Sequence, residues 1–482
     1  MRRPAEHACL GLAAVLAVVA RAPAQDAGQV TTFRTGDGSH FVLLPDGGPP
    51  VCHWTVATPA GPLEDPPGFD GLAVACARAS LRGTWHIGSR DATAEPAALL
   101  ALDQALADLS AASRTDGHEP AALQQAVERA RTAAAALADP QAFLRVLAAA
   151  PALDVEVSDL QSATVLRCTT DLPALQRVAE LLVERREQPA LRGLHEEFAA
   201  VRTLLAAPWR SDPLQPLRAE ALALAFPGQA LARAADRPGA SRPDQTMAAG
   251  VWRRTQRPDR SIHVLVGGFA VAPVRAILER AFALTALPNQ PLPPPAPPRT
   301  ATASRRSTVP GLAQPACVLG FHLAGDEDPN SLATALRWLA SGTDGWLLRE
   351  LPQAGILGAT AVATLPWPLP GAPQLLVLEV RGGSVPNERL ADTVLRLCAG
   401  NTMPVPTATE LAPIHAALVA KWEYDSRDGR QFATLLAVQA LLRPEQALPI
   451  APPAPASPAA VATLLQTVLR DPAPIVVECK LP

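Results

Sequence analysis

Hydrophobic and polar positions alternate from Thr32 to Leu44 and again along VCHWTVATPAG, and the turn PDGGPP lies between these two runs. Alternation with a period of two, in segments rich in β-branched residues, is typical of paired β-strands, so we expect a β-hairpin here. The following segment, GLAVACARASLRGT from Gly71 to Thr84, has the outline of a helix. That helix carries almost no side chain that can do chemistry.

Residues 95–138 are rich in Ala, Leu and Gln, which favour helix, and Thr115-Asp116-Gly117 interrupts them. We therefore predict a hairpin of two long helices. Further elements are expected in the order of a short helix at 140–149, strands around LDVEVSDL and ATVLRCTT, a helix at 172–187, another helical region and the strand SIHVLVGG.

Clustered prolines in LPNQPLPPPAPPRT favour an extended, semi-rigid spacer, and we place a linker between two domains at residues 287–310. Beyond it the order of patterns starts again. The segment from Pro315 echoes the segment from Pro50, each with Pro-x-Cys, a strand, Asp-Pro and a helix that closes on Gly. A second echo links SIHVLVGGFAVAPVRAILERAFA to QLLVLEVRGGSVPNERLADTVLRLC.

These echoes predict a duplicated α+β unit. The expected architecture is two homologous lobes, each a mostly antiparallel sheet with helices packed on one side, joined by the Pro-rich linker. The N-terminal domain spans residues 25–286 and includes the helical hairpin, and the C-terminal domain spans residues 311–482.

The composition fits two globular domains and excludes one class of partner. The chain has 482 residues, of which 48% are apolar and 18% charged, so it can bury two real cores. The formal net charge of -3 gives no basic field for a phosphate backbone, and only 4% of the residues are aromatic. We therefore expect no nucleic-acid partner.

Residues 1–24 have the pattern of a secretory signal peptide, with Arg2 and Arg3, an apolar run from Ala8 to Ala20, and Ala22-Pro23-Ala24 as an A-x-A cleavage site. The run is shorter than the roughly 20 residues of a membrane span, so we expect no transmembrane anchor in the mature chain. The protein is expected to be exported to a periplasm or out of the cell. Six cysteines follow the signal peptide and none lie at CxxC spacing, which favours buried thiols; their pairing stays open.

The stretch LPDGGPPVCHWTVATPAGPLEDPPGFDGLA, with Gly83-Thr84 closing the helix, resembles the opening of the insulinase and pitrilysin-like zinc metallopeptidases. Together with DPQAFLRVLAAAPALDVEVSDLQSATVLRCTTD, LLVERREQPALRGLHEEFAAV and FPGQALARAADRP, the resemblance covers most of residues 30–445. It implies two homologous α+β domains. It also implies a helix with an inverted H-x-x-E-H motif, whose histidines bind zinc while its glutamate polarises the metal-bound water, and a distal glutamate as third ligand.

The resemblance places these functional positions on unsuitable residues. Aligned on Gly71 and Gly83-Thr84, the first histidine falls on Val74, the glutamate on Ala77 and the second histidine on Arg78. Aliphatic side chains have no lone pairs to donate, and a protonated guanidinium repels a dication.

The remaining family positions are also changed. The distal glutamate falls near Leu204, to within one helical turn, and the segment that offers an Arg and a Tyr to the substrate has Trp346 and Leu348 instead. We therefore predict that no catalytic residues and no site for zinc, the family's cofactor, are left.

Other chemistry-bearing residues are explained more simply. His195-Glu196-Glu197 would point about 100° apart on a helix and cannot converge on one ion, so a solvated face is expected. His53 and His322 lie in strand patterns and are expected to be core or groove residues. Asp326-Glu327-Asp328 fits a turn and helix cap better than a calcium site. The sequence has no nucleophile elbow and no Walker-type phosphate loop.

We expect an exported, catalytically inactive homologue of these peptidases that acts as a partner subunit of an active homologue or as a peptide-binding protein. An extended peptide is expected to add to a sheet edge by main-chain hydrogen bonds, which need no metal. Two alternatives stay open, an active zinc-dependent endopeptidase with a misregistered or unconventional site, and a structural envelope protein.

Overall fold

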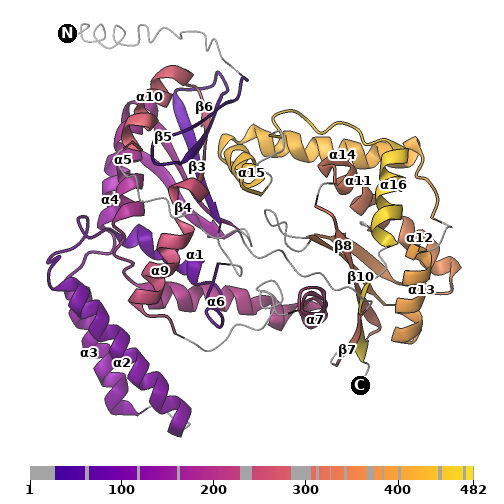
Figure 1. Cartoon of the computed structure of the whole chain (residues 1–482), viewed down its shortest axis with the longest axis horizontal. Coiled ribbons are helices and arrows are strands. Elements are labelled where there is room, and N and C mark those ends of the chain that lie inside the picture. Colours follow the sequence, from indigo (N-terminus) through magenta and orange to yellow (C-terminus); the bar gives the residue numbers. More distant parts are fainter. Residues whose placement is uncertain are drawn as a thin grey trace, which may run out of the picture.

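The computed structural model shows two α+β lobes side by side (Figure 1). It describes residues 28–59, 64–116, 120–159, 163–227, 242–283, 305–310, 314–325, 327–340, 345–365, 374–382, 385–399, 403–442, 448–470 and 474–480. The predicted signal peptide and residues 287–304 of the predicted linker lie outside this part of the chain.

The first sheet contains six strands in the order β1 (Thr31–Arg34), β2 (His40–Pro45), β6 (Ile262–Gly267), β3 (Val51–Pro59), β5 (Ala163–Asp171) and β4 (Ala152–Asp159). All neighbouring strands are antiparallel except β2 and β6, which are parallel. This agrees with the prediction of a mostly antiparallel sheet.

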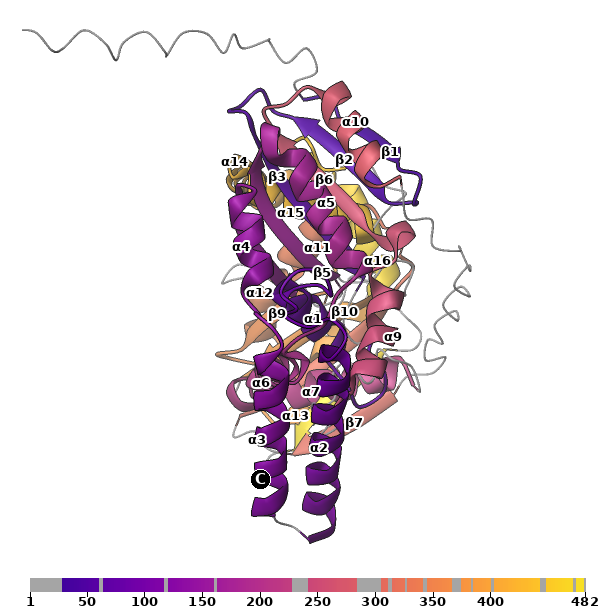
Figure 2. The same ribbon diagram turned by 90° about the vertical axis from the view of Figure 1, so that its left-hand side faces the viewer.

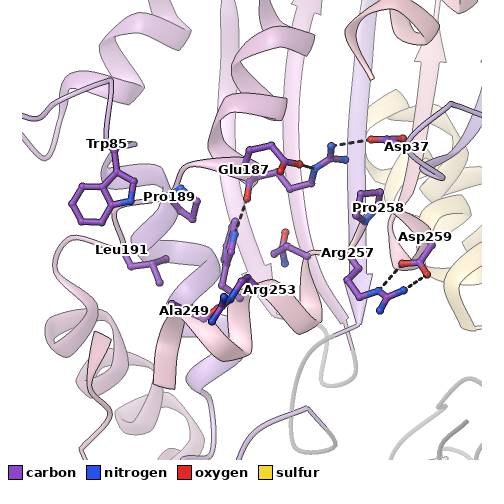
Figure 3. A pocket seen from close by; sticks show the side chains of 13 residues that line it. Asp37, Trp85, Glu187, Pro189, Leu191, Ala249, Arg253, Arg257, Pro258 and Asp259 are labelled. Carbon is purple, nitrogen blue, oxygen red and sulfur yellow. Dashed lines mark hydrogen bonds and ion pairs between the residues drawn. The ribbon is translucent and has the colours of Figure 1, made fainter. Parts of the chain in front are cut away.

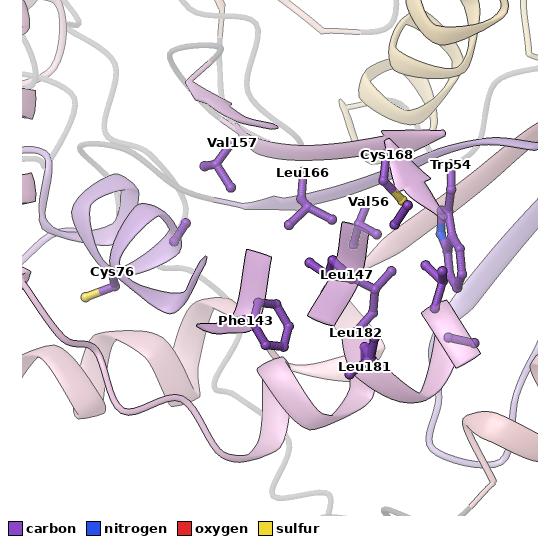
Figure 4. Close-up of a cluster of buried hydrophobic side chains, with 14 of the residues drawn as sticks. Trp54, Val56, Cys76, Phe143, Leu147, Val157, Leu166, Cys168, Leu181 and Leu182 are labelled. Carbon is purple, nitrogen blue, oxygen red and sulfur yellow. The ribbon is translucent and has the colours of Figure 1, made fainter. Parts of the chain in front are cut away.

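The helices of the N-terminal half are α1 (Leu72–Ala79), α2 (Glu95–Asp116), α3 (Ala121–Ala136), α4 (Ala142–Ala149), α5 (Leu175–Glu187), α6 (Leu194–Ser211), α7 (Gln215–Ala225), α9 (Gln245–Thr255) and α10 (Val271–Ala281). Short 3₁₀ helices are η1 (Ser80–Arg82), η2 (Leu172–Ala174) and η3 (Pro258–Arg260). Helices α4, α5 and α10 cover one face of the sheet (Figure 2). Trp54, Leu166 and Cys168 of the sheet meet Phe143 of α4 and Leu181 of α5 in the apolar core between them (Figure 4).

The second sheet contains five strands in the order β7 (Arg305–Pro310), β11 (Ile475–Lys480), β8 (Ala316–Leu323), β10 (Gln374–Arg381) and β9 (Thr360–Thr364). Only β7 and β11 are parallel. The helices of this half are α11 (Pro329–Ala340), α12 (Trp346–Gln353), α13 (Asn387–Ala399), α14 (Ala408–Arg427), α15 (Gly429–Leu442) and α16 (Pro458–Leu469).

The two sheets have the same topology once β1 is set aside, as the duplication predicted. Strands β2, β6, β3, β5 and β4 correspond in order and direction to β7, β11, β8, β10 and β9. The first sequence echo is correct, because it pairs β3 and α1 with β8 and α11. The second echo is wrong, because it matches β6 with β10, whereas β10 and α13 occupy the place of β5 and α5.

Two local predictions need correction. The turn PDGGPP joins β2 to β3, but these strands are not neighbours, because β6 lies between them. The end of β6 runs close under that turn: a Cβ on Gly268 would lie 2.2 Å from the carbonyl oxygens of Gly48 and Pro49. Residues 305–310, predicted as the end of the linker, form strand β7.

Each sheet also has a helix on its second face, which corrects the prediction of helices on one side only. Helix α7 from the N-terminal half packs on β7, β8 and β11, where Leu217 and Leu222 meet Val318 and Val477. Helix α15 from the C-terminal half packs on β3, β5 and β6 through Phe432 and other apolar residues. The two halves thus exchange equivalent helices, and α6 and α14 precede them.

Helices α2 and α3 form the predicted hairpin, which projects away from the first lobe (Figure 2). Leu102, Leu106 and Val127 form a small core of its own. A buried ion pair fixes its base, where Arg192 Nε donates to Glu95 Oε1 at 2.5 Å. The same guanidinium donates to the carbonyl oxygens of Arg82, Thr84 and Ile87.

Gly71 is the N-cap of helix α1, and its φ of 89° lies in the left-handed region that favours glycine. Gly71 has no side chain to cap the helix, so Asp65 caps it from six residues upstream. Its two carboxyl oxygens accept hydrogen bonds of 2.7 Å from the N–H groups of Gly71 and Ala73. Burial raises the pKa of Asp65 from 3.8 to about 7, although both hydrogen bonds favour the charged form.

The raised pKa of Asp65 predicts a specific pH dependence. Because the folded pKa exceeds the unfolded one, the folded state binds more protons between pH 4 and 7, and stability from this group declines as pH rises through that window. Asp65→Asn removes the titration. We expect the free energy of unfolding of the unmodified protein, relative to the variant, to fall by roughly 2–3 kcal/mol between pH 5 and 8 in urea denaturation. A difference that stays constant with pH would contradict this account.

A network of charges holds α7 to the second sheet and gives a second prediction. Arg218 Nη2 donates to Glu379 Oε2 at 2.8 Å and Nη1 pairs with Asp212, which Arg381 also contacts at 3.1 Å. Arg218→Met leaves the carboxylate of Glu379, only 8% exposed, without this partner, so the free energy of unfolding should fall by about 2–3 kcal/mol. The control Arg177→Met breaks an exposed pair within α5 and should cost under about 1 kcal/mol. Equal effects in chemical denaturation would argue against the network.

Candidate functional site

Residues 74, 77 and 78 lie on one face of α1, since each residue turns the helix by about 100°. Val74 is 1% exposed and Ala77 is fully buried, so both are part of the apolar core of the first lobe. Arg78 is partly exposed and makes no hydrogen bond or ion pair with the described part of the chain. The face at which the family resemblance expects the zinc ligands thus consists of two aliphatic groups and one cation.

These residues do not fit a zinc ion. Zinc takes nitrogen, sulfur or oxygen lone pairs at about 2.0–2.3 Å, and neither an aliphatic side chain nor a protonated guanidinium supplies one. A second cation lies near: Arg185 of α5, 5% exposed, donates from Nη2 to the carbonyl oxygen of Ala77 at 3.3 Å. Its guanidinium lies 5.2 Å from the ring centre of Trp252, and burial lowers its pKa to about 9. Arg185 was not singled out from the sequence.

Helix α6 lies against α1, as the resemblance implies for the helix of the third ligand. Leu204, the predicted position, is 58% exposed. Val201 and Leu205 face α1 instead: their side chains reach within 2.5 and 3.0 Å of where a Cβ on Gly71 would stand. Both residues lie within one helical turn of Leu204, which is the error that the sequence alignment of this position allowed. Both are aliphatic and cannot bind zinc.

The charged residues at the start of α6 have structural partners. Glu197 pairs with Arg82 at 2.7 Å, and Glu196 lies 3.6 Å from Arg131 of α3. His195 corrects the prediction of a solvated face, because its side chain is only 12% exposed and its Nε2 lies 2.7 Å from Asp103 of α2. No local pattern could have predicted this pair, since the two residues are 92 positions apart.

The corresponding positions in the second lobe are part of its core. Trp346 is 3% exposed, and its ring stacks on that of Trp338 at 5.7 Å between ring centres and 11° between ring planes. Leu348, half-buried on the same helix α12, packs against the same apolar cluster. Neither residue offers the hydroxyl or guanidinium that the family directs at its substrate.

The other candidate residues have structural partners that account for them. His53 Nδ1 lies 3.1 Å from Thr169 Oγ1, and the ring of His322 makes an edge contact with Phe226 of the exchanged segment after α7. Asp328 accepts from the N–H of Ser331 and so caps α11, as expected. Asp326 lies outside the described residues. Within the described ranges no group of three or more His, Cys, Asp or Glu side chains is placed to hold a metal ion.

The six cysteines from Cys52 to Cys479 are buried, and none of them forms a disulfide within the described part of the chain. Burial raises the pKa of Cys168 to about 12 and also raises that of Cys76, so these thiols are not reactive at neutral pH. None of the described helices is both long and apolar enough to span a bilayer.

An edge of the first sheet lies beside α1. Strand β4 contacts α1 and is the outermost strand of its sheet; among the described residues it pairs with β5 alone. Its register shifts between Leu153 and Glu156, where Asp154 has a φ of 52°. Leu153 is 59% exposed. The outer edge therefore offers main-chain donors and acceptors to an extended chain.

No protein-family profile matches the sequence, and no curated protein matches it. Solved structures do. A protease from Helicobacter pylori has a TM-score of 0.67 at 15% identity, over 94% of this chain and 99% of that one. A peptidase M16 inactive domain from Pseudomonas fluorescens has a TM-score of 0.63 at 14% identity, over 94% and 98%.

A third similar structure is the periplasmic protease PqqL from Escherichia coli, with a TM-score of 0.57 at 13% identity. The match covers 94% of this chain and 48% of that protease, so this chain spans about half of its length. The resemblance to the insulinase and pitrilysin-like peptidases is thus confirmed at the level of the fold, which this chain shares with two proteases and with an inactive M16 peptidase domain.

Proposed function

We propose that this chain is a catalytically inactive homologue of the insulinase and pitrilysin-like peptidases that acts as a partner subunit or a peptide-binding protein. The observation that carries the proposal is the face of α1, where Val74 and Ala77 are packed into the core and Arg78 places a cation. Hydrolysis by this family needs a metal-bound water, and these side chains cannot hold the metal.

The peptide-binding role is supported by the outer edge of β4. Main-chain hydrogen bonds along a strand edge depend on backbone geometry and not on a metal, so they outlast the loss of the zinc ligands. The edge lies beside α1, so a peptide bound there would cross the position at which a catalytic homologue cleaves its substrate.

The subunit role is supported by the fold relatives and by the family resemblance. One solved relative is named as an inactive domain. The family resemblance adds that some bacterial members work as pairs of subunits. This chain has neither the zinc ligands nor the Arg and Tyr, so in such a pair it would contribute shape and surface. The predicted signal peptide, together with a relative named as periplasmic, supports an exported protein.

Restoring the motif tests whether the former site is now core. In the triple variant Val74→His, Ala77→Glu, Arg78→His, two polar groups enter positions that are at most 1% exposed. We expect the free energy of unfolding to fall by roughly 2–5 kcal/mol, measured by urea denaturation. The control Arg78→His changes a partly exposed position and should cost under about 1 kcal/mol. The purified unmodified protein should hold no stoichiometric zinc; one zinc per chain with chelator-sensitive peptide hydrolysis would contradict the proposal.

A backbone-modified peptide tests binding at the β4 edge. A fluorescent, unstructured 20-residue peptide with blocked ends is titrated with the protein, next to the same sequence N-methylated at alternate residues. We expect the methylated peptide to bind at least about tenfold more weakly, because it cannot donate along one edge. Equal binding of both peptides would exclude strand addition, and binding of neither would leave only the subunit role. Sedimentation with an active homologue that carries H-x-x-E-H tests that role.

A further inference from the structure

A pocket of about 720 Å³ lies on the first lobe (Figure 3). It is bounded by the end of α5, by α9, by η3 and by Trp85. Helix α9 packs on the side of α1 that carries Cys76, whose Sγ lies 3.6 Å from the carbonyl oxygen of Ala248. Cys76 is about 200° around the helix from Val74. The pocket is therefore behind α1, and its lining includes none of residues 74, 77 and 78 and no residue of β4. Trp252, which lines the pocket, also lies 5.2 Å from the Arg185 guanidinium that binds the backbone of α1.

The polar walls of the pocket are held in place by ion pairs. Arg186 pairs with Asp37 at 2.8 Å and with Glu187 at 2.7 Å, and its side chain is 8% exposed. Arg257 makes two hydrogen bonds to Asp259, at 2.6 and 2.9 Å. The indole N–H of Trp252 donates to the carbonyl oxygen of Arg186 at 2.8 Å, which ties α9 to the end of α5. A ligand would therefore meet a preorganised surface.

Two charged side chains of the pocket have hydrogen-bonding atoms without a partner among the described residues. Arg253 is exposed and donates only from Nε, to the carbonyl oxygen of Ala249 in its own helix at 3.3 Å. Its two terminal amino groups have no partner within the described residues. Glu187 accepts from Arg186 through Oε1, and its Oε2 has no partner in the same part of the chain. The pocket is thus lined by the Arg253 guanidinium and the Glu187 carboxylate, each of which has polar atoms able to bind a ligand.

The opposite part of the pocket is apolar. The Trp85 ring, Pro189, Leu191 and Ala249 lie together at one end, apart from the ion pairs (Figure 3). The backbone N–H of Trp85 is fixed by the carbonyl oxygen of Gln188 at 3.0 Å. Aromatic and aliphatic walls with a few placed polar groups are the usual lining of a small-molecule site.

The balance of charge identifies the class of ligand. The lining residues include three guanidinium groups and three carboxylates, from Arg186, Arg253, Arg257, Asp37, Glu187 and Asp259. Their formal charges cancel, so the pocket has no net field for an inorganic anion or a metal cation. A ligand that carries one positive charge, one negative charge and an apolar body could pair with Glu187 and Arg253 and pack at the apolar end of the pocket. The volume lies within the range of about 300–1,000 Å³ typical of ligand sites.

We propose that this pocket binds a short peptide with free amino and carboxyl ends and apolar side chains. Its carboxylate pairs with Arg253, its ammonium pairs with Glu187, and an apolar side chain packs on Trp85 and Leu191. This inference goes beyond the proposed function, because edge binding at β4 uses internal backbone groups and does not need free ends.

Isothermal titration calorimetry of the full-length mature protein with trileucine tests the proposal. N-acetyl-trileucine removes the ammonium and trileucine amide removes the carboxylate, and each should bind at least about tenfold more weakly. Arg253→Gln, Glu187→Gln and Trp85→Ala should each weaken trileucine binding by a similar factor, while Arg129→Gln, an exposed arginine on α3, should leave it unchanged. Free leucine is also titrated. Tight binding of leucine would support recognition of free amino and carboxyl ends, with an amino acid in place of a peptide.

Three results would overturn the proposal. They are no binding of trileucine or leucine by the unmodified protein, equal binding of the blocked and free peptides, and unchanged binding in both Arg253→Gln and Trp85→Ala. Thermal denaturation of each variant separates a loss of binding from a loss of fold, and Arg253→Gln is the least disruptive because Arg253 is exposed and outside every ion pair.

Discussion

The exchange of α7 and α15 between the halves is the constraint on which the rest of this structure depends. A sheet with two apolar faces must cover both, and each lobe covers its second face with a helix from the other half. In the second sheet, Val318 and Val477 are buried under α7. In the first sheet, the apolar face is covered by α15 through Phe432 and its neighbours. Each half builds its main core from its own residues, but neither covers the second face of its own sheet, so the exchanged helices hold the two lobes together.

Within this frame, α1 is a packing element of the first lobe. In a catalytic homologue the face at positions 74, 77 and 78 would present imidazoles and a carboxylate, and here it contributes packing through Val74 and Ala77. Arg185 and Asp65 bind the backbone of α1 near its two ends. The exposed edge of β4 and the pocket lined by α9 are the two places at which we propose that a ligand binds.

Local patterns predicted much of this molecule, and long-range pairings were what they missed. The alternation of hydrophobic and polar residues predicted strands β3 and β5, and the run of Ala, Leu and Gln predicted the α2–α3 hairpin. The repeated Pro-x-Cys segments at Cys52 and Cys317 indicated the duplication. The insertion of β6 between β2 and β3 was not predictable, because a parallel pair is made by residues more than 200 positions apart. The same reason hid the helix exchange and the pair of His195 with Asp103, and the pocket is assembled from four separate segments.

The most direct test of the central claim is anomalous X-ray diffraction above the zinc edge, from crystals of this protein grown with zinc. The account predicts no anomalous peak between the lobes or beside Val74, Ala77 and Arg78. A peak there, surrounded by nitrogen or oxygen ligands drawn from any part of the chain, would contradict it.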